Sequence, residues 1–180
     1  MIIYKQFEKK YEKEIYQLVF NTMKEELNVS LEQLIDSIKD LKDISKNYIE
    51  SGGNFWIAID ILKNKIVGTV SIKMNKDIVE FKRYYVQKEY RNKGIGYKLY
   101  KIAEKYAKDN FINEIYLVSG KELSKAHRIY EMNGWKKVDA KKMAKDIYIR
   151  EGAYLYKKEL KYLENMNYKN AHMLKSVLCN

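Results

Sequence analysis

The spacing of apolar residues along the chain predicts alternating strands and helices. Four stretches have apolar residues at helical spacing, namely 8–23, 31–41, 95–109 and 124–133. Shorter runs rich in Val, Ile, Phe and Tyr predict strands at 2–7, 55–60, 65–73, 77–87, 114–119, 135–138 and 153–160. This order of elements indicates a mixed α/β (α+β) fold.

Local sequence signals mark several of the predicted boundaries. Ser30 and Gln33 form a capping box for the second helix. The segment 62–64 separates two strands and predicts a hairpin. Gly134 stands where the fourth helix should end with a residue in the left-handed conformation, and Trp135 then opens the next strand. The chain contains no proline, so these caps and glycines carry the boundary assignment.

Composition indicates one domain in a reducing compartment. A chain of 180 residues with 46% hydrophobic content suits a single domain with its own core. No apolar run approaches the roughly 20 residues that cross a bilayer, and residues 1–5 lack the apolar segment of a signal peptide. The single cysteine, Cys179, excludes an internal disulfide framework. Cys179, His127 and His172 are the histidine and cysteine side chains available to bind a metal, so we expect no metal site. The single cysteine and the lack of a signal peptide together predict a cytoplasmic protein.

The segment Tyr90–Gly96 carries the strongest chemical signal. It joins a predicted strand to a predicted helix, and a helix that begins at a glycine-bearing turn leaves backbone N–H groups free to bind phosphate. Gly94 and Gly96 allow close approach of an anion, and Arg91 and Lys93 add positive charge. A P-loop string is absent, and no third glycine completes a Rossmann fingerprint.

The pattern Arg91-x-x-Gly94-x-Gly96 resembles the pyrophosphate-binding motif of the GCN5-related N-acetyltransferase (GNAT) family. A second segment, Ser124–Trp135, resembles the Ala-x-x-x-Tyr-Glu-x-x-Gly-Phe signature of that family. The resemblance covers residues 1–160. It implies a single domain with a mixed, mostly antiparallel sheet of about six to seven strands, flanked by about four helices. Residues 161–180 would form a docking helix or a loose tail.

The resemblance implies acetyl-CoA as co-substrate and an amine of a small molecule, peptide or protein as acceptor. Implied cofactor-binding residues are Tyr85, Val86, Arg91, Asn92, Lys93, Gly94, Ile95, Gly96, Ser124 and His127. Two departures stand out: Lys88 occupies the place of a proline that stiffens the turn, and Leu123 that of an asparagine contacting the pantetheine arm. Ser124 or Ser119 could supply the lost contact.

The resemblance also suggests two catalytic residues. Tyr130 stands at the place of the tyrosine that protonates the departing sulfur; the alternative is that Tyr130 is an aromatic residue of the core.

Glu80 is the candidate for the general base, because it lies eleven positions before Arg91, where histone-acetylating relatives place their base. Strand alternation would put Glu80, Lys82, Tyr84 and Val86 on one face. The alternatives are a solvated glutamate and a water path, with His127 a weaker candidate for the base.

The formal net charge of +11 admits three interpretations: nucleic-acid binding, a lysine-rich solvated surface, and attraction of the anionic coenzyme. The lysines are spread along the chain, which disfavours binding to nucleic acid.

Acidic residues in 21–29 and 139–151, among them Glu25, Glu26, Asp139 and Asp146, could bind a cationic amine acceptor or simply be surface charges. The sequence thus predicts an N-acetyltransferase, as a monomer or homodimer. The alternatives are a catalytically silent acyl-CoA sensor and an enzyme acting on aminoacyl-tRNA.

Overall fold

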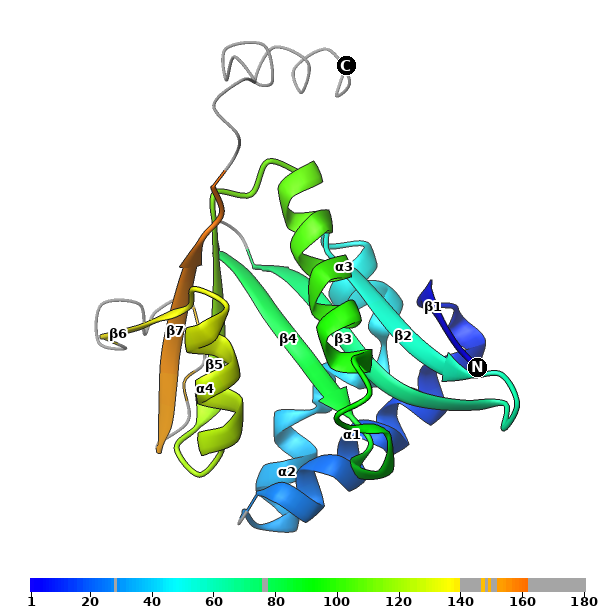
Figure 1. The fold of residues 1–180 in the computed structure, drawn as a ribbon. Coiled ribbons are helices and arrows are strands. Elements are labelled where there is room, and N and C mark those ends of the chain that lie inside the picture. The colour runs from blue at the N-terminus through cyan, green and yellow to red at the C-terminus, as the bar shows by residue number, and fades with distance from the viewer. Residues whose placement is uncertain (28, 76–77, 140–146, 148, 150–151, 162–180) are drawn as a thin grey trace.

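The seven predicted strands form one sheet. The computed structural model describes residues 1–27, 29–75, 78–139, 147, 149 and 152–161. Its strand order is β1-β2-β3-β4-β5-β7-β6, and the β4–β5 pairing is parallel whereas the others are antiparallel (Figure 1). The strands are β1 (Ile2–Gln6), β2 (Asn54–Asp60), β3 (Lys65–Asn75), β4 (Ile78–Val86), β5 (Glu114–Gly120), β6 (Lys136–Val138) and β7 (Ala153–Glu159). The predicted mixed, mostly antiparallel sheet is confirmed.

The four predicted helices are present, with shorter turns between them. The helices are α1 (Glu12–Glu26), α2 (Leu31–Ser37), α3 (Ile95–Asp109) and α4 (Ser124–Met132). The additional turns are the 3₁₀ turns η1 (Lys9–Tyr11), η2 (Lys39–Lys42) and η4 (Lys88–Tyr90), and the π turn η3 (Ser45–Ile49). The sequence pattern did not predict these turns.

The second helix shows both a confirmed and a corrected prediction. In the predicted capping box, Gln33 N donates to Ser30 Oγ at 3.2 Å and Ser30 N donates to Gln33 Oε1 at 3.0 Å. The helix then ends at Ser37 instead of running to 41. Ser37 Oγ donates to the carbonyl oxygen of Leu34 at 2.7 Å, a local bond that competes with helix continuation. The chain proceeds into η2, so the apolar spacing continues although the α-helix does not.

Helices cover both faces of the β1–β4 half of the sheet (Figure 1). Leu99 and Ala103 of α3 belong to one buried cluster with residues of β2 to β4. Ile15 and Val19 of α1 belong to a second cluster on the opposite face. Since both clusters include strand residues, the core has two layers, and the sheet separates them.

β4 and β5 separate toward their C-terminal ends. Their register consists of one parallel pair, Glu80 with Tyr116. Beyond it the strands diverge and leave a gap in the middle of the sheet (Figure 1). A gap at the carboxyl ends of parallel strands is a usual place for a ligand.

A bulge in β4 corrects the predicted alternation of its side chains. Thr69 pairs with Tyr85 but Ser71 pairs with Lys82, so β4 has one extra residue there, and Arg83 takes a φ of 55°. As a result, Tyr84 lies on the α3 face, whereas Lys82 lies with Asp40 on the other face. The prediction that Glu80, Lys82, Tyr84 and Val86 share one face is therefore wrong.

Several predictions fall on residues outside the described part of the chain. These concern most of the acidic connection 139–151, including Asp146, and the extension 161–180 beyond Lys161. Among the helices of the described part, none combines the length and apolar character needed to cross a membrane.

Candidate active site

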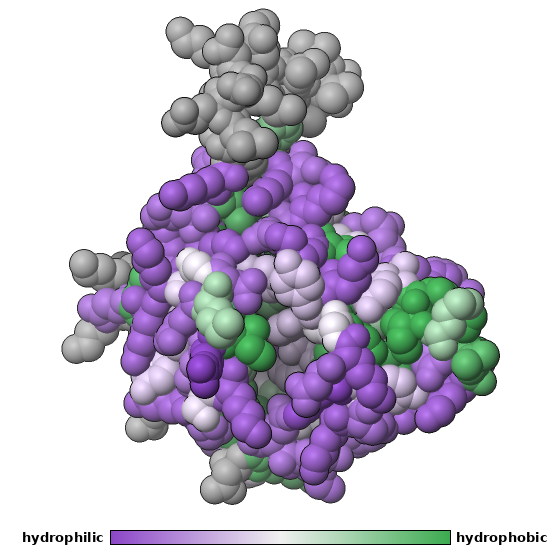
Figure 2. All heavy atoms as spheres, viewed as in Figure 1, coloured by the Kyte–Doolittle hydropathy of each residue, from purple (hydrophilic) through white to green (hydrophobic). Residues whose placement is uncertain are grey.

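A cavity of about 760 Å³ lies between the end of β4, the start of α3 and α4, beside the gap where β4 and β5 separate. Its walls come from the end of β4, the turn that follows, the first turn of α3, the inner side of α4 and the end of α1. Figure 2 shows the molecular face hollowed between α3 and α4. The structure brings eight predicted site residues together in its lining: Tyr85, Val86, Arg91, Asn92, Gly94, Gly96, Ser124 and Tyr130.

The turn before α3 has the geometry of an anion-binding site. Gly94 precedes the helix in the left-handed conformation with a φ of 76°, and a Cβ added there would have no neighbour within 4 Å. The first α-helical hydrogen bond runs from Lys98 N to Gly94 O at 3.0 Å, so the N–H groups of residues 95–97 precede it. At Gly96 a Cβ would lie 2.9 Å from Tyr84 Oη, so only glycine fits without displacing that phenol.

The charged residues of this turn have different surroundings. Arg91 lines the cavity, where its Nη2 lies 2.5 Å from Glu26 Oε1 and its Nε donates to Val86 O at 2.9 Å. Lys93 Nζ donates to the carbonyl oxygen of Glu89 at 2.9 Å, and Lys93 does not line the cavity. The side chain of Ile95 is buried in the core, which leaves its backbone for contact with a ligand. Arg91 is therefore the cation of the turn that lies in the cavity.

Tyr130 both packs in the core and lines the cavity. Its ring centroid lies 5.9 Å from that of Tyr156 and 6.3 Å from that of Trp135. Burial raises the pKa of Tyr130 above its usual value, and the neighbouring phenols and Glu26 raise it further. The predicted helix end holds it in place: Gly134 has a φ of 82°, and Trp135 N donates to Tyr130 O at 3.1 Å. At neutral pH this phenol is protonated and can donate a hydrogen bond.

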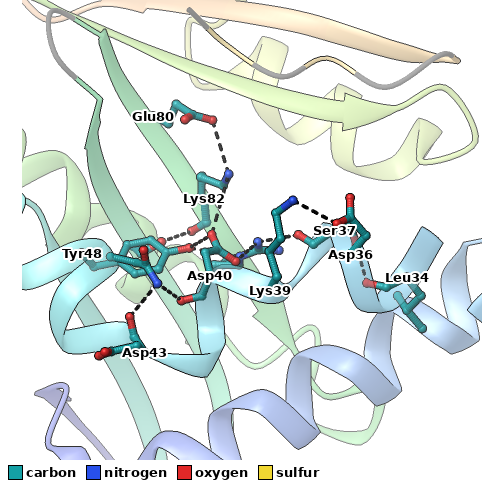
Figure 3. A network of polar contacts seen from close by, with 12 residues as sticks. Leu34, Asp36, Ser37, Lys39, Asp40, Asp43, Tyr48, Glu80 and Lys82 are labelled. Carbon is teal, nitrogen blue, oxygen red and sulfur yellow. Dashed lines mark hydrogen bonds and ion pairs between the residues drawn. The ribbon is translucent and has the colours of Figure 1, made fainter. Parts of the chain in front are cut away.

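Glu80 lies at the point where β4 and β5 part, but outside the lining of the cavity. Its side chain is buried on the face away from α3, where Asn75 donates to it and Lys82 Nζ lies 3.5 Å away. Figure 3 shows Lys82 between Glu80 and Asp40, near Tyr48. Burial and the charge of Arg83 lower the pKa of Lys82.

His127 faces away from the cavity, toward β7. Its Nε2 lies 2.9 Å from Gly120 O, and its ring packs 5.3 Å from Tyr154 and 5.7 Å from Tyr156. These contacts give the predicted cofactor role of His127 no support.

Ser119 lies on β5, where its Oγ is buried without a hydrogen-bond partner among the described residues.

Sequence reasoning missed several residues that line the cavity. Ile129 and Asn133, the latter at the C-cap of α4, lie on the side that also carries Ala126 and Tyr130, and helical spacing from Ala126 could have identified them. Tyr84 lines the cavity as well, on the face that simple strand alternation does not predict because of the bulge. The sequence grouped Glu25 with Glu26, but only Glu26 reaches this cavity.

A family model agrees with the geometry of the site. The model of the Acetyltransferase (GNAT) family matches residues 13–135. N-acetylaspartate synthetase of Xenopus tropicalis is 34% identical over 102 residues, which are 55% of this chain and 37% of that protein. N-acetyltransferase 8 of Homo sapiens is 30% identical over 105 residues, 54% of this chain and 45% of that protein. The chain thus spans less than half the length of these relatives.

Solved structures share the fold. A GNAT-family acetyltransferase from Staphylococcus aureus Mu50 superposes with a TM-score of 0.79 at 27% identity, covering 89% of this chain and all of that one (100%). PaiA N-acetyltransferase from Thermoplasma acidophilum, crystallised with coenzyme A, superposes with a TM-score of 0.72 at 20% identity, covering 88% of this chain and 99% of that one.

Proposed function

This chain belongs to the acetyltransferase (GNAT) family, and on that premise we propose that it transfers an acetyl group from acetyl-CoA to a primary amine of a small molecule, peptide or protein. The observation that carries the proposal is the cavity between the end of β4 and α4, which meets the start of α3. It joins an anion-binding turn to a buried phenol, as transfer from a phosphate-bearing thioester requires.

The residues of the cavity fit coenzyme A. The backbone N–H groups at the start of α3, with Arg91, would hold the pyrophosphate. Ser124 lines the cavity and would contact the pantetheine arm in place of the asparagine that Leu123 replaces, whereas Ser119, the alternative, lies outside the lining. When bound, acetyl-CoA supplies an activated acetyl thioester.

Two side chains of this protein would then handle protons. Tyr130 would donate a hydrogen bond to the sulfur as it departs, since its phenol is protonated at neutral pH. An amine must lose a proton before it attacks, and Glu80 is the proposed acceptor of that proton. Because Glu80 lies at the apex of the gap on the face away from α3, the amine would approach from that face.

The proposal is tested by mixing the protein with acetyl-CoA and a panel of primary amines, and following release of free thiol. We expect at least one amine to release thiol at a rate proportional to protein concentration. Coenzyme A binding without thiol release from any amine would instead indicate a silent acyl-CoA sensor. Absence of coenzyme A binding in calorimetry would refute both.

A matched pair of glycines tests the anion-binding turn. Gly94 and Gly152 have φ values of 76° and 73°, and nothing lies within 4 Å of an added Cβ at either. Gly94→Ala and Gly152→Ala should therefore cost a similar 1–2 kcal/mol of backbone strain, roughly. Only Gly94 lines the cavity, so only Gly94→Ala should weaken coenzyme A binding. Equal coenzyme A affinities in the two variants would show that this turn does not bind the cofactor.

A further inference from the structure

One ion pair crosses the cavity from the end of α1 to the anion-binding turn. Glu26 Oε1 lies 2.5 Å from Arg91 Nη2. The two side chains are 29% and 38% exposed, respectively, and both residues line the cavity. The pair thus occupies space that lies beside the proposed pyrophosphate site.

The position of Glu26 is unfavourable for a carboxylate by itself. It is the last residue of α1, and the partial negative charge at a helix C-terminus favours cations there. Arg91 offsets this cost in the structure. A residue that is unfavourable for its own helix, as this carboxylate is at a helix C-terminus, is typical of a functional position when it lines a cavity.

Arg91 has a second potential partner under the proposed function. A pyrophosphate at the start of α3 would compete with Glu26 for the same guanidinium, because a phosphate and a carboxylate bind that planar group in the same way. Once the phosphate takes Arg91, the carboxylate of Glu26 is left in the cavity without its cation.

We propose that Glu26 binds the protonated amine of the acceptor, and that cofactor binding makes it available by drawing Arg91 away. This inference rests on the proposed function and names the acceptor class, a cationic amine. Glu26 is suited to the task because it shares the cavity with Tyr130 and lies near Tyr85, which packs against the face covered by α1. The ammonium would replace the guanidinium as the partner of the carboxylate. Acceptor binding would therefore depend on bound cofactor.

Glu25 provides a matched control. It precedes Glu26 in the last turn of the same helix, but it lines a separate cavity of about 150 Å³ together with Leu18 and Lys65. Glu25→Gln removes the same charge at nearly the same distance along α1, without touching Arg91.

The first arm of the test measures coenzyme A affinity by calorimetry in the parent, Glu26→Gln and Glu25→Gln. The phosphate no longer competes with a carboxylate in Glu26→Gln, so we expect coenzyme A to bind about two- to fivefold tighter, the size of a partly exposed ion pair. Glu25→Gln should match the parent. Unchanged or weaker affinity in Glu26→Gln would overturn the exchange of partners at Arg91.

The second arm repeats the coenzyme A titrations with n-butylammonium, and with tetramethylammonium at equal ionic strength as a cation that lacks N–H donors. In the parent, n-butylammonium should tighten coenzyme A binding relative to tetramethylammonium, whereas Glu26→Gln should show no difference. A parent that does not distinguish the two cations, or a Glu26→Gln variant that still does, overturns Glu26 as the amine-binding residue. If the parent binds no coenzyme A at all, it is the proposed function that has failed.

Discussion

Tyr130 combines two roles that the sequence alone could not separate. Its ring packs against Trp135 and Tyr156, as a core aromatic does, yet it also lines the cavity. Its raised pKa bears on the chemistry, because an ordinary thiol has a lower pKa than an ordinary phenol. Under the proposed function, the departing thiolate would therefore be a weaker base than the phenolate. Tyr130 would then donate a hydrogen bond to the sulfur instead of transferring its proton fully.

Replacement of Tyr130 by phenylalanine separates these roles. Tyr130→Phe keeps the ring contacts and removes the hydroxyl, so the melting temperature and coenzyme A affinity should stay near the parental values. Turnover in the thiol-release assay should fall by about 10²-fold or more, as when a donor to developing charge is lost. Normal turnover per folded molecule combined with lower stability would assign Tyr130 to packing alone.

Glu80 is testable through the dependence of rate on pH. Glu80→Gln should bind coenzyme A normally but react more slowly, by about 10²–10⁴-fold for a lost general base, and most strongly below the pKa of the acceptor amine. Glu114→Gln serves as the control, because its carboxylate pairs with Lys157 outside the lining of the cavity. Superimposable pH–rate profiles for parent and Glu80→Gln would assign proton removal to water or to another residue.

At the scale of elements, the bulge in β4 decides which side chains face the cavity. Arg83 adopts the left-handed conformation at the bulge and its guanidinium is buried against Asp40. It also donates to Ser37 O at 2.7 Å and to Tyr48 Oη at 3.1 Å. Tyr48 in turn donates to Asp40 at 2.6 Å (Figure 3). This network joins the bulge to the segment between α2 and η3, and so orients Tyr84 and Tyr85.

Removal of Asp40 should destabilise the bulge. Burial by itself would raise the pKa of Asp40, but Arg83 and Lys82 hold it below the usual value, so the carboxylate is charged at neutral pH. Asp40→Ala leaves Arg83 buried without its partner, at a cost of about 3–5 kcal/mol in the free energy of unfolding. Asp36→Ala, which removes an exposed pair with Lys39, should cost less than about 1 kcal/mol. Equal costs in urea denaturation would show that the buried pair does not stabilise the fold.

At the scale of the whole molecule, features set by residues close together in the sequence were predictable, and features set by pairing between distant strands were not. The capping box at Ser30 and the helix end at Gly134 are set by residues a few positions apart, so the sequence displayed them. The bulge at Arg83 depends on the register between β3 and β4, and no glycine marks it. The short pairing of β4 with β5 likewise depends on strands about thirty residues apart. The sequence therefore predicted the motifs that line the cavity, but not which other side chains form its walls.

The two halves of the sheet are tied together across the gap by a charged contact. Lys158 of β7 lies 2.5 Å from Glu104 and donates to Tyr100 Oη at 2.6 Å, both on α3. Since α3 packs on β2 to β4, this contact joins that half of the sheet to the half formed by β5, β7 and β6. Tyr100 also lines the cavity, so the same contact borders the candidate site.

The contact predicts a specific loss of stability in acid. Burial opposes ionisation of Glu104, but hydrogen bonds from Lys101 and Lys158 lower its pKa to about 2. The unfolded chain has the higher pKa of about 4.3, so this stabilisation is complete above that pH and is lost as the pH falls toward 2. Glu104→Gln should therefore cost roughly 2–3 kcal/mol in the free energy of unfolding at pH 7, and its difference from the parent should shrink between about pH 5 and pH 2. Asp109→Asn removes an exposed pair with Lys105 on the same helix and should change stability little at any pH. A constant difference between parent and Glu104→Gln across this range would mean that packing, and not the charged contact, joins the two halves.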